Sequence, residues 1–268
     1  MKKSNKQINL EHKLLNMLSD KTLKTAEIIF KHKELQAMQD YANIVSIKRL
    51  GFNDHGPVHM RKAALNSMLM FDLLDAKGIK LNLESEGVAQ NTDSKVAVFI
   101  ASILHDLGMT VARDSHEWVS MVMAYKYIDE ILDQIYSAKE LQIKVAVRSI
   151  IMEGIFGHMA THKIHSLEAG LVLVGDGCDM EEGRARIPTL LRNDPKAGDI
   201  HRYSASSIKK VEITQGENKP IKIEVKMSQS VGLFQIEEVL FPKIKSSPVK
   251  QFIELYAQVR DQEKLKYL

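Results

Sequence analysis

Cysteine is nearly absent from this chain of 268 residues, and its single copy, Cys178, excludes an intrachain disulfide. Cys178 falls inside an apolar helical segment, so we interpret it as a small core residue rather than a nucleophile. Aromatic residues make up only 6%, which leaves little material for a surface that stacks nucleic-acid bases. No apolar run is long enough to cross a bilayer, and no signal-peptide core follows the basic start Met1-Lys2-Lys3. These absences predict a soluble, cytoplasmic protein with no membrane partner.

A strong charge of one sign is also missing. The net charge is +3, and the lysines are scattered and concentrate toward both ends of the chain. This excess is too small to indicate nucleic-acid binding, for which basic residues usually cluster on one face. We therefore interpret these lysines as a solvated surface.

Helical spacing of apolar residues dominates the first 200 positions. It predicts helices within 8–50, from Pro57 onward, over 95–105, over 116–136 and over roughly 139–155. Ser166 is a plausible N-cap for another helix, and the polar stretch 76–94 reads as a loop. Gly170, Gly175 and Gly177 are poor helix formers, so their presence in the last of these helices suggests close approach of another backbone.

The pattern changes near residue 200, after the loop 192–199. Apolar and polar residues alternate over 206–213 and 221–227, which is typical of half-buried strands. A helix is expected over 231–244, and 252–259 suits a strand or a helix. The fold class predicted is mainly α over residues 1–200, with a small α+β domain over 201–268. That domain shows no catalytic grouping, and we expect it to pack on the helices or on a second copy, giving a homodimer.

The most informative pair is His105-Asp106, which directly follows the apolar run Val96–Leu104. An imidazole and a carboxylate at the end of a buried segment are costly to desolvate unless they are paired or bind a metal. His59 on an earlier helix and Asp176 in a later apolar run complete an ordered set that favours a metal. Asp179 is the alternative to Asp176 as ligand or orients one, and His55 reads as a loop histidine.

The order of these residues resembles the HD superfamily of metal-dependent phosphohydrolases. The motif H…HD…D is carried by His59, His105-Asp106 and Asp176, in the segments His59-Met-Arg-Lys-Ala, Ile103-Leu-His-Asp-Leu-Gly108 and Val174-Gly-Asp-Gly-Cys-Asp179. The resemblance covers roughly residues 50–190. It implies an HD-type helical bundle that binds one or two divalent transition metals, and the ligand types suit Mn, Fe, Ni or Zn.

Some members of this superfamily hold a second metal with additional histidines. His116, His158 and one of His162 or His165 fall where those ligands would come, and Asp106 would bridge the two metals. The chain lacks the Gly-Tyr-Pro element and the adjacent histidine pair of the branch that degrades cyclic-di-GMP. The resemblance therefore leaves the substrate open.

The function that the resemblance implies is hydrolysis of a phosphate ester by a metal-activated water, most plausibly in a nucleotide or cyclic nucleotide. Asp106 would hold the metals. Arg113 and Arg184 are the first candidates to bind the phosphate, and Arg186 and Lys163 are weaker candidates. Two alternatives stay open. One is a regulatory module that binds a nucleotide or nucleic acid around a non-catalytic metal, and the other is a dinuclear-iron oxygenase.

Overall fold

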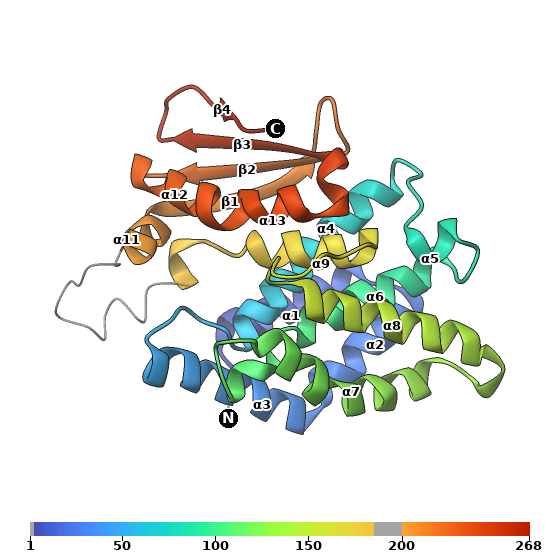
Figure 1. Cartoon of the computed structure of the whole chain (residues 1–268). Helices are drawn as coiled ribbons and strands as arrows, with labels where there is room; N and C mark the ends of the chain where they lie inside the picture. Colours follow the sequence, from blue (N-terminus) through green and yellow to red (C-terminus); the bar gives the residue numbers. More distant parts are fainter. Residues whose placement is uncertain (1–2, 185–199) are drawn as a thin grey trace.

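A computed structural model describes residues 3–184 and 200–268 of the chain (Figure 1). The described part is mainly α-helical, with a small sheet near the C-terminus, as the sequence predicts. The helices before the undescribed segment are α1 (Asn5–Met17), α2 (Asp20–Lys31), α3 (Lys33–Ile44), α4 (Pro57–Asp75), α5 (Asn82–Ser85), α6 (Asn91–Leu104), α7 (His116–Ile135), α8 (Leu141–Gly157) and α9 (Leu167–Gly177). After it come α11 (Ile200–Ser207), α12 (Leu233–Gln235), α13 (Phe241–Ser246), β1 (Ile208–Gln215), β2 (Ile221–Met227), β3 (Ile253–Val259) and β4 (Leu265–Lys266).

Helix α6 lies at the centre of the helical part. Its segment Val96–Leu104 is fully buried, because a helix that is apolar on all sides must be covered on all sides. Helices α2, α4, α8 and α9 pack around it. The C-terminal end of α6, where His105 follows, is therefore held in the interior.

Two stretches differ from the expectation. The segment 76–94, expected to be a loop, contains the short helix α5 and the first residues of α6. Helix α6 starts earlier than predicted because Gln90 and Asp93 form a reciprocal capping box, which satisfies backbone N–H groups at the helix start. The region 8–50 is helical as predicted, but it is divided into α1, α2, α3 and a final turn over Val45–Leu50.

Helices α4 and α9 approach each other closely. A Cβ built on Gly175 would lie 2.1 Å from Ser67 Oγ and 3.0 Å from Ala63 O. Ser67 Oγ donates to Leu171 O at 3.1 Å, so the hydroxyl of α4 reaches the backbone of α9. The expectation that another backbone comes close to this glycine-rich helix is confirmed.

The sheet has the order β1-β2-β3-β4. Strands β1 and β2 form an antiparallel hairpin, β2 and β3 are parallel, and β4 is antiparallel to β3. The helical segment from Ser230 to Ser246 makes the long connection that parallel strands require. Within the region 252–259, for which the sequence allowed a strand or a helix, residues Ile253–Val259 form β3.

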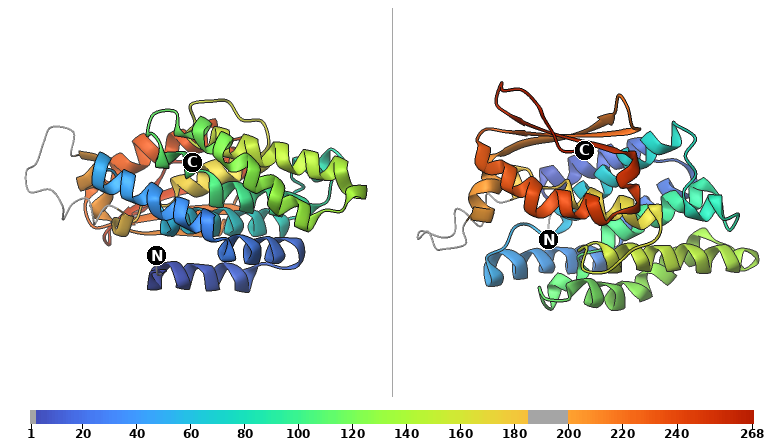
Figure 2. Two further views of the ribbon diagram at one scale, coloured as in Figure 1. Left: turned by 90° about the horizontal axis from the view of Figure 1, so that it is seen from below. Right: turned by 45° about the horizontal axis from the view of Figure 1, so that its top comes forward.

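The C-terminal residues pack directly on the helices. Strand β1 lies against α4, and α13 lies beside α9 (Figures 1 and 2). One continuous hydrophobic cluster includes side chains of α6 and α9 together with those of β2 and β3. Among the described helices, none has the length and apolar character needed to span a membrane.

Candidate metal centre

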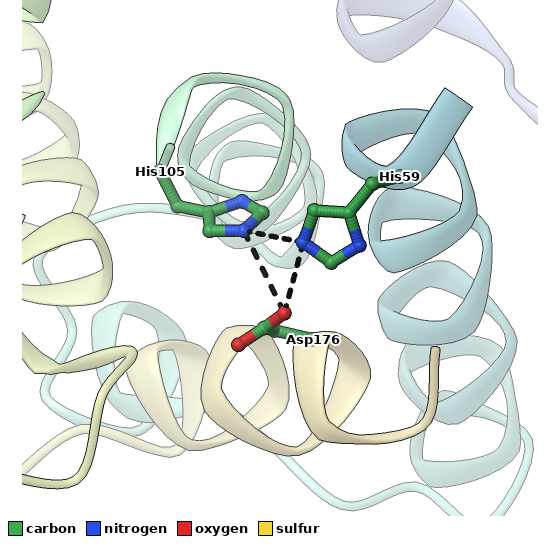
Figure 3. A group of neighbouring side chains, drawn as sticks. All are labelled: His59, His105 and Asp176. Atoms are coloured by element: carbon green, nitrogen blue, oxygen red, sulfur yellow. Dashed lines mark hydrogen bonds and ion pairs between the residues drawn. The ribbon is translucent and has the colours of Figure 1, made fainter. Parts of the chain in front are cut away.

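Four helices and the turn after α6 bring six of the seven predicted ligands together. His59 is the third residue of α4, His105 caps the end of α6, and Asp176 lies in the last turn of α9. Figure 3 shows these three side chains pointing toward a common point between their helices. His116 begins α7 and His158 ends α8. All of these side chains are buried.

The first group of ligand atoms comprises His59, His105 and Asp176. His59 Nε2 lies 3.1 Å from His105 Nε2 and 3.1 Å from Asp176 Oδ1, and His105 Nε2 lies 3.7 Å from the same oxygen. These separations suit three atoms that face one small cation.

Asp106 lies between this group and a second pair of imidazoles. Its Oδ2 is 3.2 Å from His59 Nε2 and 3.3 Å from His105 Nε2. Its Oδ1 is 3.1 Å from His116 Nε2 and 3.5 Å from His158 Nε2, and those two nitrogens are 3.0 Å apart. The two oxygens of one carboxylate thus face two separate pairs of histidines.

The histidine rings are held from behind. Because a carbonyl oxygen only accepts, the Nδ1 atom that contacts it must be the protonated one, which leaves Nε2 with a lone pair in the neutral ring. This arrangement occurs three times, each with the carbonyl three residues earlier: His105 with Ser102 O at 2.9 Å, His116 with Arg113 O at 2.8 Å, and His158 with Ile155 O at 2.6 Å. His59 Nδ1 instead contacts Asp179 Oδ2 at 2.7 Å. Such outer contacts orient metal-binding histidines.

The donor set fits a transition metal. Asp106 Oδ2 is buried and accepts no hydrogen bond from the described residues. A buried ionised oxygen that accepts no hydrogen bond is costly, and a cation shared with the His59 and His105 nitrogens, 3.2 and 3.3 Å away, would offset that cost. Imidazole nitrogens combined with carboxylate oxygens are the ligands that Mn, Fe, Ni or Zn prefer over Ca or Mg.

The pKa values of the clustered side chains also indicate that the carboxylates attract positive charge. Burial and the Arg184 cation lower the pKa of His59, but the carboxylates of Asp106, Asp176 and Asp179 outweigh them and raise it to about 10. Burial, opposed by Asp106, lowers the pKa of His158 to about 4. A proton on His59 thus supplies the positive charge that the carboxylates demand.

Burial alone would raise the pKa of Asp106 and of Asp176. Nearby histidines hold the pKa of Asp106 well below its ordinary value, and Lys243 with His59 does the same for Asp176. Both carboxylates are therefore ionised and able to bind a cation.

Arg184 is the predicted cation that reaches the cluster. Its Nη2 lies 3.1 Å from His59 Nε2, and its Nη1 donates to Asp179 O at 2.9 Å. Arg113 lies further out, with its guanidinium over the Phe52 ring at 5.5 Å. Arg186 lies outside the described residues, and Lys163 is exposed.

His162 is not brought to the cluster. Its ring stacks on Phe156 at 4.3 Å, its side chain is 36% exposed, and its Nε2 lies 4.0 Å from Glu117 Oε1. His165, the alternative, is exposed. His162 was predicted to join His116 and His158, and this prediction is corrected here. The loop after α8 directs the imidazole toward the Phe156 ring instead. Asp179 orients His59, and His55 is buried with its ring 5.6 Å from that of His59.

Sequence reasoning missed Lys243. This side chain enters the cluster from α13, forms an ion pair with Asp176 Oδ2 and donates to His158 O at 2.8 Å. Only its place in an apolar run, between Phe241 and Ile244, could have hinted that it is buried.

Comparison with known proteins gives one informative match. No protein-family profile matches the chain, and no solved structure matches it. The chain is 36% identical over 235 residues, which cover 88% of each sequence, to "Uncharacterized protein MJ1020" of Methanocaldococcus jannaschii. At this identity over this share of both chains, the protein with the buried histidine–aspartate cluster belongs to the same family as the archaeal MJ1020 protein.

Proposed function

We propose that this protein is a metal-dependent phosphohydrolase of the HD superfamily, which cleaves a phosphate ester. The observation that carries the proposal is the position of Asp106. Its two oxygens face His59 and His105 on one side and His116 and His158 on the other. A shared carboxylate between two sets of nitrogen ligands is the arrangement expected of a two-metal hydrolytic site.

When bound, divalent metals supply Lewis acidity toward phosphoryl oxygens and make water acidic enough to react near neutral pH. His59, His105, Asp106 and Asp176 would hold one ion. Asp106, His116 and His158 would hold another, and these three side chains leave positions free for water or substrate. The contacts behind each histidine keep its Nε2 directed inward, so little reorganisation accompanies binding.

Arg184 is the proposed phosphate-binding residue. Its guanidinium lies beside His59, and a charged N–H donor binds phosphate oxygens strongly. Its Nε and Nη1 are already held by the Asp54 and Asp179 carbonyls, which leaves Nη2 directed at the cluster. Arg113 would act at the outer edge, where an extended substrate such as a nucleotide carries further charge.

The test is a phosphate-release screen with the whole chain. Nucleotides, cyclic nucleotides and simple phosphomonoesters are incubated with protein loaded with Mn²⁺, Fe²⁺, Ni²⁺ or Zn²⁺, and elemental analysis gives the metal content. We expect metal-dependent release of phosphate or cleavage of a phosphodiester. Arg184→Gln should raise KM about 10-fold or more, because it removes a charged contact to the phosphate.

Arg49→Gln is the matched control. Arg49 is exposed and contacts Tyr41, and its removal should leave turnover unchanged. Metal-loaded protein that binds nucleotides but never cleaves any of these substrates would refute the hydrolase proposal and favour a binding module. Consumption of oxygen would instead favour an oxygenase.

A further inference from the structure

Lys243 is a buried cation at a place where two ligand groups meet. It lies on α13, in the C-terminal part of the chain, and is only 8% exposed. Its ammonium forms an ion pair with Asp176 Oδ2, the oxygen turned away from His59, and donates to the carbonyl of His158 at 2.8 Å. It therefore contacts one residue from each of the two groups of candidate ligands.

The residues around Lys243 leave room for its side chain. Gly177 follows Asp176, and a Cβ at that position would lie 3.1 Å from Lys243 Cδ. A lysine without a partner is almost never fully buried, because its ammonium loses its hydration. The cost is offset here by one carboxylate and one carbonyl, both of which belong to residues of the cluster.

We infer that Lys243 is a positioning residue of the metal centre. By holding Asp176 Oδ2, it leaves Oδ1 as the oxygen that faces His59 and His105. By holding the His158 carbonyl, it fixes the end of α8 relative to α9 and so the spacing of the two ligand groups. The C-terminal part of the chain thereby completes a centre whose ligands all come from the helical part. This inference rests on the proposed metal centre.

Two effects of Lys243 on metal binding oppose each other. Its charge repels a divalent cation, whereas its hydrogen bonds orient Asp176 and the His158 backbone. Repulsion is reduced because three carboxylates, those of Asp106, Asp176 and Asp179, lie in the same cluster. Loss of the hydrogen bonds would leave two buried oxygens without their partner. Orientation should therefore dominate, and removal of the ammonium should weaken binding.

The experiment compares Lys243→Met with Lys245→Met in the full chain. Lys245 lies on the same helix but is exposed, with its ammonium over the Phe241 ring. Affinity for Zn²⁺ and Co²⁺ is measured by competition with a chromophoric chelator. Lys243→Met should bind about 10–100-fold more weakly than the wild type, the usual effect of losing an outer partner of a ligand. Lys245→Met should bind as the wild type does, and equal or tighter binding by Lys243→Met would overturn the inference.

The visible absorption of Co²⁺-loaded protein reports the ligand geometry directly. Release of Asp176 Oδ2 should change band positions or intensity in Lys243→Met, which a purely structural role would not do. Lys243→Arg keeps a charged donor and should bind more tightly than Lys243→Met. If circular dichroism shows that Lys243→Met does not fold, Lys243→Gln takes its place, because its shorter neutral side chain removes the charge and cannot donate to both Asp176 Oδ2 and the His158 carbonyl. An unchanged affinity and spectrum in that variant would overturn the inference.

The outcome for the wild type separates this inference from the proposed function. A wild-type chain that binds no divalent metal refutes the metal centre and the inference with it. A wild-type chain that binds metal while Lys243→Met binds it equally well refutes only the role of Lys243.

Discussion

Asp106 is the residue on which both ligand groups depend. Asp106→Ala removes the oxygen shared with His59 and His105 as well as the one shared with His116 and His158. We expect bound metal and metal-dependent turnover to be lost by about 100-fold or more, since outer-sphere changes alone cost 10–100-fold. Helicity should persist, because Asp106 follows the end of α6 and its side chain caps no helix among the described residues. Elemental analysis and circular dichroism measure the two effects, and full metal-dependent turnover in this variant would contradict the assignment.

His59 predicts how metal affinity depends on pH. In the metal-free protein its pKa is raised to about 10, so the ring is protonated at neutral pH and must lose a proton when a metal binds. The pKa of His158 is about 4, so this ring is already neutral. Affinity should therefore rise as pH increases toward 10, by about tenfold per pH unit for one released proton.

Calorimetric titration with Zn²⁺ in two buffers of different ionisation enthalpy measures the number of protons released. At pH 7 we expect the release of about one proton for each Zn²⁺ bound, because His59 must lose its proton before it can bind the metal. His162→Gln serves as the control, because this half-buried imidazole lies outside the cluster and its loss should leave the metal affinity and its pH dependence unchanged. A metal affinity that stays constant from about pH 6 to about pH 8 would contradict a protonated His59.

At the residue scale the sequence predicts which candidate ligands lie together better than it predicts what surrounds them. His59, His105, Asp106, His116, His158 and Asp176 converge as their order suggests, since each lies at a helix end or on a buried helix face. His162 does not, because an irregular loop carries no periodicity from which its direction can be inferred. Lys243 was missed because a single lysine in a helix normally indicates a solvated position.

At the scale of elements, the contact between α4 and α9 sets the distance from His59 to Asp176. Gly175→Ala places a Cβ 2.1 Å from Ser67 Oγ and 3.0 Å from Ala63 O, where backbone atoms cannot easily yield. We expect a loss of stability of about 1–3 kcal/mol, the usual cost of overpacking, measured by urea unfolding. Metal affinity should also fall, because the two helices separate beside Asp176.

Gly183→Ala is the comparison for this substitution. Among the described residues, its Cβ would meet only the end of the flexible Lys6 side chain, at 3.2 Å, so stability should change by less than about 0.5 kcal/mol. If Gly175→Ala were as stable and bound metal as tightly as Gly183→Ala, the close approach of α4 and α9 would not position the site.

The sequence predicts helices and strands correctly where the spacing of apolar residues keeps one period along the whole element. The helices α4, α7 and α8 and the strand β2 agree with the apolar spacing, and Ser166 caps α9 by accepting from Ala169 N at 3.0 Å. Helix α6 begins before its apolar run because the Gln90–Asp93 capping box lies among residues that otherwise resemble a loop. The expected helix over 231–244 is divided into short helical pieces, and only tertiary contacts decide such breaks.

At the scale of the whole molecule, the candidate ligands couple the helices to one another. They come from α4, α7, α8, α9 and the end of α6, and Lys243 adds α13. One hydrophobic cluster also runs through the helices and the sheet. A cation held by so many elements binds the folded chain and not the unfolded one, so its binding energy adds to the stability of the entire fold.

Removal of metal should therefore lower the melting temperature of the whole chain. At a free metal concentration of about 100 times Kd the gain is about 2.7 kcal/mol, which corresponds to a shift of roughly 5–10 °C for a chain of this size. Differential scanning calorimetry with and without a chelator measures the shift. Asp106→Ala should melt at the same temperature in both conditions, because it has lost the shared ligand. A chelator effect of equal size in Asp106→Ala would mean that the stabilising metal binds elsewhere, since only an ion held by the cluster ties its stability to this carboxylate.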